Sequence, residues 1–285
     1  MASLDEKVKL RFLQWQGLYK EEKPFEIVTE TIQGSESRRT NLLFGTNGEQ
    51  TITDIRGREG TQFALDSHGF AYRPKPCPFD GYDNKQRILE EYLPWAESII
   101  KQEIGDIGRV FIFDWRLRRS DFTPRRVDLT ELHQYLPVAS TCHVDQSPWE
   151  MVKRCRKFLG AEAEELFKGR IRIINLWKPL SHTIQDRPIA VCDGSTVDQA
   201  DLVHTDYVRR DDVQETMYLL HNDRQKWYYL SRQTPDEVLL IKIYDSSLAV
   251  KAINCPHSSF FHSKIPPTAV PRQSIEVRAF VFSRS

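Results

Sequence analysis

Alternation of apolar and polar residues dominates the C-terminal half of the chain and predicts β-strands there. The pattern is clearest in segments 170–177 (RIRIINLW), 238–244 (VLLIKIY) and 274–282 (SIEVRAFVF). Two shorter apolar runs, 216–220 and 226–230, flank the polar stretch HNDRQ and predict a hairpin. Many short strands separated by turn residues are typical of a β-sandwich or jelly roll.

Helical patterns are concentrated in the first 170 residues. Residues 85–104 (KQRILEEYLPWAESIIKQEI) predict a helix that is kinked or broken at Pro94, and residues 109–115 (RVFIFDW) predict the next strand. Residues 137–145 predict a strand that leads into a further helix.

That further helix is expected over residues 147–168. Ser147 can cap its first turn, and Glu150, three residues later, completes a capping box. Gly160 is a candidate interruption, because glycine weakens a helix interior.

These elements together predict a mainly β fold with flanking helices, built on a double-stranded β-helix (jelly roll, cupin-like) core. We expect one domain over residues 1–285. Residues 1–105 would be an N-terminal extension with helices packed on the core, and residues 106–285 would be the core, with the helix at 147–168 inserted.

Composition excludes several classes of protein. Lys+Arg and Asp+Glu both number 40, so no net charge attracts nucleic acid or an anionic membrane surface. The five cysteines are scattered without a CxxC pair, which argues against a disulfide framework and a zinc knuckle. No apolar stretch approaches the length of a membrane span. We expect a cytoplasmic protein without nucleic-acid or membrane partners, and a homodimer is left open.

The sharpest chemical signal is His143-Val144-Asp145. Residues i and i+2 of a strand point to the same side, so an imidazole and a carboxylate project together. With a second histidine they would form a 2-His-1-carboxylate triad, which leaves open positions on a non-haem iron(II). An HxD tripeptide alone is weak evidence for a metal site, because such triplets are frequent by chance.

A downstream strand carries a candidate site for a dicarboxylate. Arg272, Ser274, Glu276 and Arg278 share one face of that strand. An arginine fork binds a carboxylate in bidentate fashion, and a serine adds a hydroxyl donor. A surface strand with Arg–Glu pairs explains the same residues equally well.

Motifs along nearly the whole chain, in the same order, resemble the fungal hydroxylase/desaturase family related to gibberellin desaturase and to the cephem methoxylation accessory protein. The motifs are LYKEEKPF (18–25), TDIRG (53–57), DSHGF (66–70), HVDQS (143–147), RIRIINLWKPL (170–180), RPIAVCD (187–193), WYYLSRQTPDEVLLIKIYDS (227–246), PHSSF (256–260) and PRQSIEVRAFVF (271–282). The resemblance implies an iron(II)/2-oxoglutarate-dependent dioxygenase with a jelly-roll fold.

The same resemblance implies roles for individual residues. His143 and Asp145 match the family's HxD metal ligands, and His257 matches the histidine of its PH motif. His262 is a rival third ligand. Arg272 and Arg278, together with Ser274, lie in the segment expected to bind 2-oxoglutarate, and which arginine grips its distal carboxylate stays open.

Polar residues on otherwise apolar strands are further candidates. Asn175 and Trp177 share one face of their strand and are expected near the co-substrate. Lys242 interrupts an apolar strand, where an unpaired ammonium would be costly. It would snorkel to water at the barrel rim, pair with Asp245 or contact the co-substrate.

The implied activity is hydroxylation, desaturation or cyclisation of a small organic molecule, with iron(II), 2-oxoglutarate and dioxygen as cofactor and co-substrates. The family usually belongs to secondary-metabolite pathways. Two other hypotheses stay open. The protein could be a non-catalytic jelly-roll accessory protein that binds a metabolite or a partner enzyme, or a metal-dependent hydrolase or isomerase with the same triad.

Overall fold

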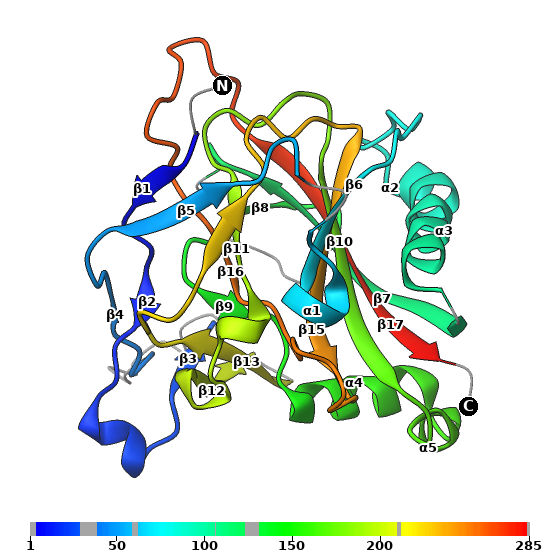
Figure 1. The fold of residues 1–285 in the computed structure, drawn as a ribbon. Helices are drawn as coiled ribbons and strands as arrows, with labels where there is room; N and C mark the ends of the chain where they lie inside the picture. The colour runs from blue at the N-terminus through cyan, green and yellow to red at the C-terminus, as the bar shows by residue number, and fades with distance from the viewer. Residues whose placement is uncertain are drawn as a thin grey trace, which may run out of the picture.

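The computed structural model describes residues 4–28, 39–58, 62–105, 107–122, 131–209 and 212–283. Two large β-sheets pack face to face, and a long helix covers the outer face of one of them (Figure 1). Within these ranges no helix has the length and apolarity needed to cross a membrane.

The larger sheet has nine strands within the described ranges. Their order is β1 (Glu6–Val8), β5 (Gln50–Asp54), β14 (Trp227–Tyr229), β11 (Ile189–Cys192), β16 (His257–Ser259), β9 (His143–Val144), β13 (Val213–Leu219), β12 (Leu202–Val208) and β3 (Phe25–Ile27). A separate small ribbon pairs β2 (Phe12–Leu13) with β4 (Phe44–Gly45).

The second sheet has six strands in the part of the chain described. Their order is β6 (Phe70–Pro74), β15 (Glu237–Asp245), β10 (Ile171–Pro179), β17 (Gln273–Ser283), β7 (Ile107–Arg119) and β8 (Tyr135–Pro137). From β9 onward the chain crosses repeatedly between the two sheets, with mostly antiparallel pairing. This arrangement confirms the predicted jelly roll.

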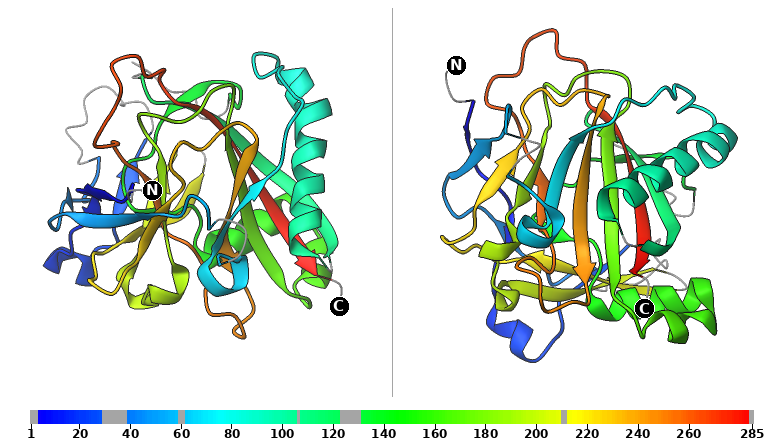
Figure 2. Two further views of the ribbon diagram at one scale, coloured as in Figure 1. Left: turned by 45° about the horizontal axis from the view of Figure 1, so that its top comes forward. Right: turned by 45° about the vertical axis from the view of Figure 1, so that its right-hand side comes forward.

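Helices lie outside the sheets (Figure 2). They are α1 (Leu65–His68), α2 (Lys85–Arg87), α3 (Leu93–Ile104), α4 (Pro148–Leu159) and α5 (Glu162–Leu166), with the 3-10 turns η1 (Gly17–Lys20), η3 (Gly194–Thr196) and η4 (Gln199–Asp201). A π-helical turn, η2 (Ile88–Tyr92), joins α2 to α3. The irregularity expected at Pro94 is therefore this turn, and Pro94 itself lies in the first turn of α3.

The six-stranded sheet is apolar on both faces because both are covered. Along β10, Ile171, Ile173 and Trp177 face the nine-stranded sheet, whereas Ile174 and Leu176 face α3. A sheet buried on both sides requires a nearly continuous apolar run. Polar side chains on its inner face are therefore exceptions that mark the site.

A β-bulge in β7 sets which of its residues face the interior. In the pairing with β17, Arg278 lies opposite Asp114 and Ala279 lies opposite Ile112, so Phe113 is the extra residue. A bulge re-aims the side chains that follow it. Both Phe113 and Asp114 consequently line the interior cavity, followed by Arg116 and Arg118.

Three local predictions need correction. The strands β13 and β14 do not pair as a hairpin: β13 pairs with β9 and β12, and β14 pairs with β11 and β5. The helix expected over 147–168 ends at Leu166 and is divided at Gly160, which confirms the candidate interruption there; Gly160 has a φ of 56°.

The capping box is only half formed. Ser147 accepts from the backbone N–H of Glu150, but the Glu150 side chain bonds Arg154 and the backbone N–H of Glu215.

The N-terminal segment does more than pack helices on the core. It supplies β1, β3 and β5 to the nine-stranded sheet and β6 to the six-stranded sheet. Lys242 of β15 is fully buried, and its ammonium donates to Asp66 and Asp245. Of the three expectations for Lys242, the structure confirms the pairing with Asp245.

The loop that leads into β16 is held by close backbone packing. A Cβ atom on Gly194 would lie 1.9 Å from the carbonyl oxygen of Asn254, and one on Gly69 would lie 2.8 Å from the same oxygen. Gly69 also has a φ of 84°, which favours glycine. These two glycines fix the approach of the chain to His257.

Replacing Gly194 by alanine should therefore destabilise the protein, because the added methyl group overlaps the backbone of Asn254. We expect the free energy of unfolding to fall by roughly 1–3 kcal/mol, measured by urea unfolding. Gly17→Ala is the matched control, since Gly17 also begins a 3-10 turn and has nothing within 4 Å of the added Cβ. Equal unfolding midpoints for the two variants would contradict this explanation.

Candidate metal centre

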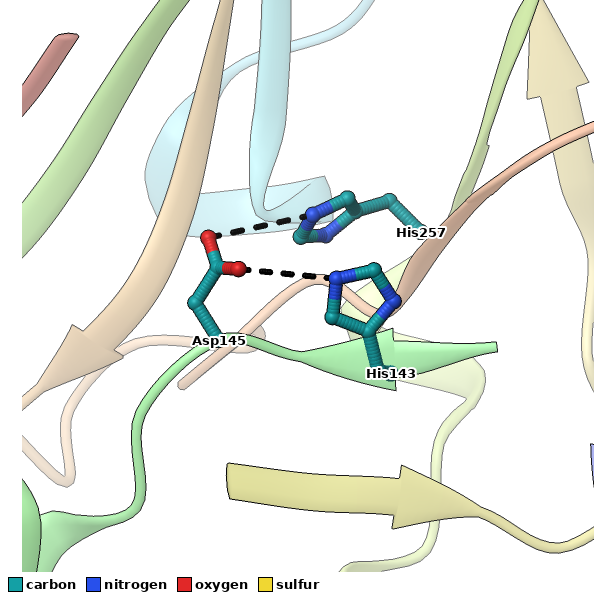
Figure 3. A group of neighbouring side chains, drawn as sticks. All are labelled: His143, Asp145 and His257. Carbon is teal, nitrogen blue, oxygen red and sulfur yellow. Dashed lines mark ion pairs between the residues drawn. The ribbon is translucent and has the colours of Figure 1, made fainter. Parts of the chain in front are cut away.

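Three side chains converge at the centre of the nine-stranded sheet. His143 lies on β9, Asp145 follows two residues later, and His257 lies opposite His143 on the neighbouring strand β16. Figure 3 shows both imidazoles facing the carboxylate. The Nε2 atom of His143 is 3.4 Å from Oδ1 of Asp145, and that of His257 is 3.9 Å from Oδ2. One ligand atom from each residue lies within 4.8 Å of the others.

Backbone carbonyls select the tautomer of both histidines. The Nδ1 atom of His143 is 2.8 Å from the carbonyl oxygen of Thr141, and that of His257 is 3.2 Å from the carbonyl oxygen of Cys255. A carbonyl can only accept, so each Nδ1 carries a proton and each Nε2 is the atom that faces Asp145. Such outer contacts are the usual way in which metal-binding imidazoles are oriented.

The carboxylate of the triad, Asp145, is held by two donors. Asn175 donates through Nδ2 to one carboxylate oxygen at 2.5 Å, and Arg278 donates through Nη2 to the other at 3.0 Å. Burial alone would raise the pKa of Asp145, but Arg278 and the two imidazoles hold it well below its ordinary value. The carboxylate is therefore charged, as a metal ligand must be.

His257 is neutral for a related reason. Burial, followed by the neighbouring His143, lowers the pKa of His257 to about 4. Two imidazoles and one carboxylate on a single face are the donor set that suits non-haem iron(II), with open positions for other ligands. The residues present thus fit the metal that the fold implies.

A narrow cavity beside the triad contains Arg272. Its walls include Trp177, Ser259 and Glu276 as well as the triad. Arg272 is 2% exposed, and its guanidinium donates to the carbonyl of Arg187 at 2.7 Å and to Oγ of Ser259 at 3.3 Å.

Asp186 and Glu276 favour the charge of Arg272 only from beyond ion-pair distance. Among the described residues its guanidinium forms no ion pair with Asp or Glu, and its Nε has no hydrogen-bond partner. Burial, with Arg118 and Arg187 nearby, lowers the pKa of Arg272 to about 9. The ring of Trp177 lies 5.3 Å from the guanidinium carbon. A buried cation without an ion-pair partner is costly, and an anionic ligand would offset this cost.

The other residues expected to bind the co-substrate lie elsewhere. The guanidinium of Arg278 is occupied by Asp145, Glu276 and Asp114, and it faces a different, larger cavity. Asn175 bonds Asp145 and does not line the narrow cavity. Ser274 is fully buried, and its hydroxyl has no partner among the described residues.

His262, the rival third ligand, is not part of the cluster. Its Nε2 lies 3.6 Å from Oε1 of Glu6, and the triad found within the described residues consists of His143, Asp145 and His257.

Arg118 is a site residue that the sequence interpretation missed. It lines both the narrow cavity and the larger one. Its signal was present in the alternation of Asp114, Arg116 and Arg118 along a strand whose other face is apolar.

Comparisons with known proteins agree with this geometry. Residues 10–282 match the family model described as YDMC, oxidoreductase/YMDC permease-like domain. Aspirochlorine biosynthesis protein N of Aspergillus oryzae is 41% identical over 149 residues, which are 52% of this chain and 63% of that protein.

Two further relatives match over most of their length. The Fe(II)/2-oxoglutarate-dependent dioxygenase nvfI of Aspergillus novofumigatus is 32% identical over 77% of this chain and 78% of its own. The hydroxylase/desaturase efuI of Hormonema carpetanum is 32% identical over 81% of this chain and 82% of its own.

The solved structure of the iron and alpha-ketoglutarate-dependent endoperoxidase NvfI superimposes with a TM-score of 0.86 at 26% identity and covers 99% of both chains. The chain therefore belongs to the family of the fungal Fe(II)/2-oxoglutarate-dependent dioxygenases and hydroxylase/desaturases, the family that its motifs resemble.

Proposed function

We propose that His143, Asp145 and His257 bind the catalytic iron(II) and that Arg272 binds the distal carboxylate of 2-oxoglutarate. Enzymes of this family use iron(II), 2-oxoglutarate and dioxygen. The observation that carries the proposal is the triad beside a buried arginine whose guanidinium forms no ion pair with Asp or Glu among the described residues.

The residues of the chain supply binding, orientation and shielding. When bound, iron(II) and 2-oxoglutarate together provide the oxidising chemistry that removes hydrogen from an unactivated carbon. Asn175 and Arg278 orient the carboxylate of Asp145, while the carbonyls of Thr141 and Cys255 orient the imidazoles. The apolar residues packed around the centre lower the local dielectric constant, which strengthens these electrostatic contacts.

Of the two arginines that the sequence left open, Arg272 is the better anchor for 2-oxoglutarate. It shares the narrow cavity with all three candidate ligands, and its cation is uncompensated. The ring of Trp177 and the hydroxyl of Ser259 restrict the orientation of its guanidinium. Arg278 already binds protein carboxylates, so we assign to it the positioning of Asp145.

We also propose that the substrate is a small organic molecule, a secondary metabolite, that is hydroxylated, desaturated or cyclised in the cytoplasm. A cavity of about 1090 Å³ next to the triad supports a substrate of this size. Its walls include His143 and Asp145, so a bound molecule would lie beside the metal.

Anaerobic addition of iron(II) and 2-oxoglutarate tests the activity. Chelation of the metal by the keto acid should give a weak charge-transfer absorption band in the visible region, and exposure to oxygen should then yield succinate. A protein that binds iron but gives no such band would be a different metalloenzyme. A protein that binds neither would be a non-catalytic accessory protein.

The assignment of the third ligand can be tested with a matched pair of variants. His257→Ala should weaken iron affinity by more than the roughly 10–100-fold that loss of an outer contact costs, because it removes a ligand. His262→Ala should keep the iron content of the wild type, since His262 contacts Glu6 and not the triad. Iron content after equilibrium dialysis measures both. Iron loss in the His262 variant alone would transfer the role to that residue.

The two arginines should give opposite signatures. Arg272→Lys loses the guanidinium fork, so the 2-oxoglutarate concentration for half-maximal succinate formation should rise roughly tenfold or more, with normal iron content. Arg278→Lys loosens Asp145, so iron affinity should fall about 10–100-fold while the 2-oxoglutarate requirement stays near that of the wild type. If only Arg278→Lys raises the 2-oxoglutarate requirement, the assignment is reversed.

A further inference from the structure

The large cavity beside the triad has an unusual combination of walls. It is lined by the aromatic rings of Phe113, Phe158, Tyr207 and Tyr218 together with several arginines. Among the described lining residues, seven are Lys or Arg and five are Asp or Glu. An enzyme that accepts only apolar molecules has no need of guanidinium groups in its substrate cavity.

Most of these cations already have protein partners. Arg154 pairs with Glu150, and Arg116 pairs with Asp114. Arg278 pairs with Asp145 and its neighbours, as described above. Such arginines are held in place by the fold and are not free to bind a ligand.

Of the other four cations, Arg39 and Lys157 are exposed, whereas Arg118 and Arg209 are half-buried. Arg118 donates to the carbonyl oxygen of Pro137 at 2.7 Å and forms no ion pair with a described residue. Arg209 lies over the ring of Tyr207, with its guanidinium carbon 5.6 Å from the ring centre. Its Nε is buried without a hydrogen-bond partner among the described residues.

Both cations lie near the hydroxyl of Tyr207. Burial raises the pKa of this tyrosine, and the positive charges of Arg209 and Arg118 act against that rise. Tyr207 is itself one of the residues that line the cavity. Two guanidinium groups and one tyrosine thus lie close together in the wall.

Acidic residues act on both arginines without contacting them. Glu276, Asp145 and Asp114 favour the charge of Arg118, and Asp114 and Asp212 favour that of Arg209, but none of them forms an ion pair with either guanidinium among the described residues. Burial is also the main reason that the pKa values of Arg118 and Arg209 are lowered. An anion placed between the two arginines would remove this cost.

We propose that the large cavity binds its organic substrate through a carboxylate held by Arg118, Arg209 and the hydroxyl of Tyr207. The inference rests on the proposed function and deepens it, because it gives the substrate class of the same centre: an amphipathic organic acid. The apolar part of the acid lies against Phe113 and Phe158.

This carboxylate site differs from the one for 2-oxoglutarate. Arg272 lines only the narrow cavity, and Arg209 lines only the large one. A dicarboxylate held at Arg272 therefore leaves Arg209 unoccupied. Arg118, which lines both cavities, stands between the two sites.

A panel of aromatic acids and their neutral amides tests the inference, for example 2-naphthylacetate against 2-naphthylacetamide. Binding to the full-length chain is measured by calorimetry, first without metal and then anaerobically with iron(II) and saturating 2-oxoglutarate. We expect wild type to prefer the acid by about tenfold or more, as charge-assisted hydrogen bonds to a carboxylate require. Arg118→Gln and Arg209→Gln should each lose most of this preference, and Arg209→Lys should keep part of it.

Arg156→Gln is the matched control. Arg156 lies on α4 near the cavity, but it pairs with Glu164, and its side chain is 57% exposed. This variant should keep the full preference for the acid. Urea unfolding of each variant shows whether a loss of binding reflects a loss of folding, and Arg209→Lys provides the folded comparison.

Three results would overturn the inference. The first is a wild type that binds no acid of the panel better than its amide. The second is full preference in either glutamine variant. The third is a preference that disappears only in Arg272→Gln, which would place the acid in the co-substrate site. The charge-transfer band, recorded on the same samples, reports on iron and 2-oxoglutarate, so failure of the proposed function is seen separately.

Discussion

The metal centre depends on one buried ion pair, between Asp145 and Arg278. A carboxylate in an apolar sandwich is costly unless it is paired and hydrogen-bonded. The register of the six-stranded sheet meets this requirement, because Asn175 of β10 lies directly opposite Arg278 of β17. Both donors thus reach the same carboxylate, one on each oxygen. A slip of one residue in either strand would turn its donor to the opposite face of the sheet and leave one oxygen of Asp145 without its partner.

The same register explains why Arg272 and Arg278 have different surroundings. Arg278 lies opposite Asp114 of β7, and this carboxylate, with Glu276 and Asp145, surrounds its guanidinium. Arg272 lies six residues earlier, just before β17, and among the described residues its guanidinium donates hydrogen bonds only to a carbonyl and a hydroxyl. One cation is therefore part of the fold, whereas the other is left for a ligand. Both side chains are arginines, so only their neighbours distinguish them.

The sequence predicted what is local. The alternation in 170–177, 238–244 and 274–282 identified β10, β15 and β17, and the spacing of His143 and Asp145 placed both side chains on one side. The predictions that failed concerned contacts between residues distant in sequence. The turn between β13 and β14 predicted a hairpin, but turn residues do not determine which strands pair. Both strands pair with other neighbours. Arg118 and Arg209 were missed because only the folded chain brings β7 and β12 to one cavity.

The unbalanced arginines connect the two ligand sites. Arg118 lies close enough to Arg272 that each cation disfavours the charge of the other, as the lowered pKa of Arg272 shows after the larger effect of burial. An anion at Arg272 therefore relieves this repulsion and reduces the positive field at Arg118, which lines both cavities. Through the second effect, the two proposed sites would be coupled: a dicarboxylate at Arg272 would weaken the binding of a carboxylate in the large cavity. Such coupling is reciprocal by thermodynamic necessity, so the substrate acid acts on 2-oxoglutarate affinity by the same factor.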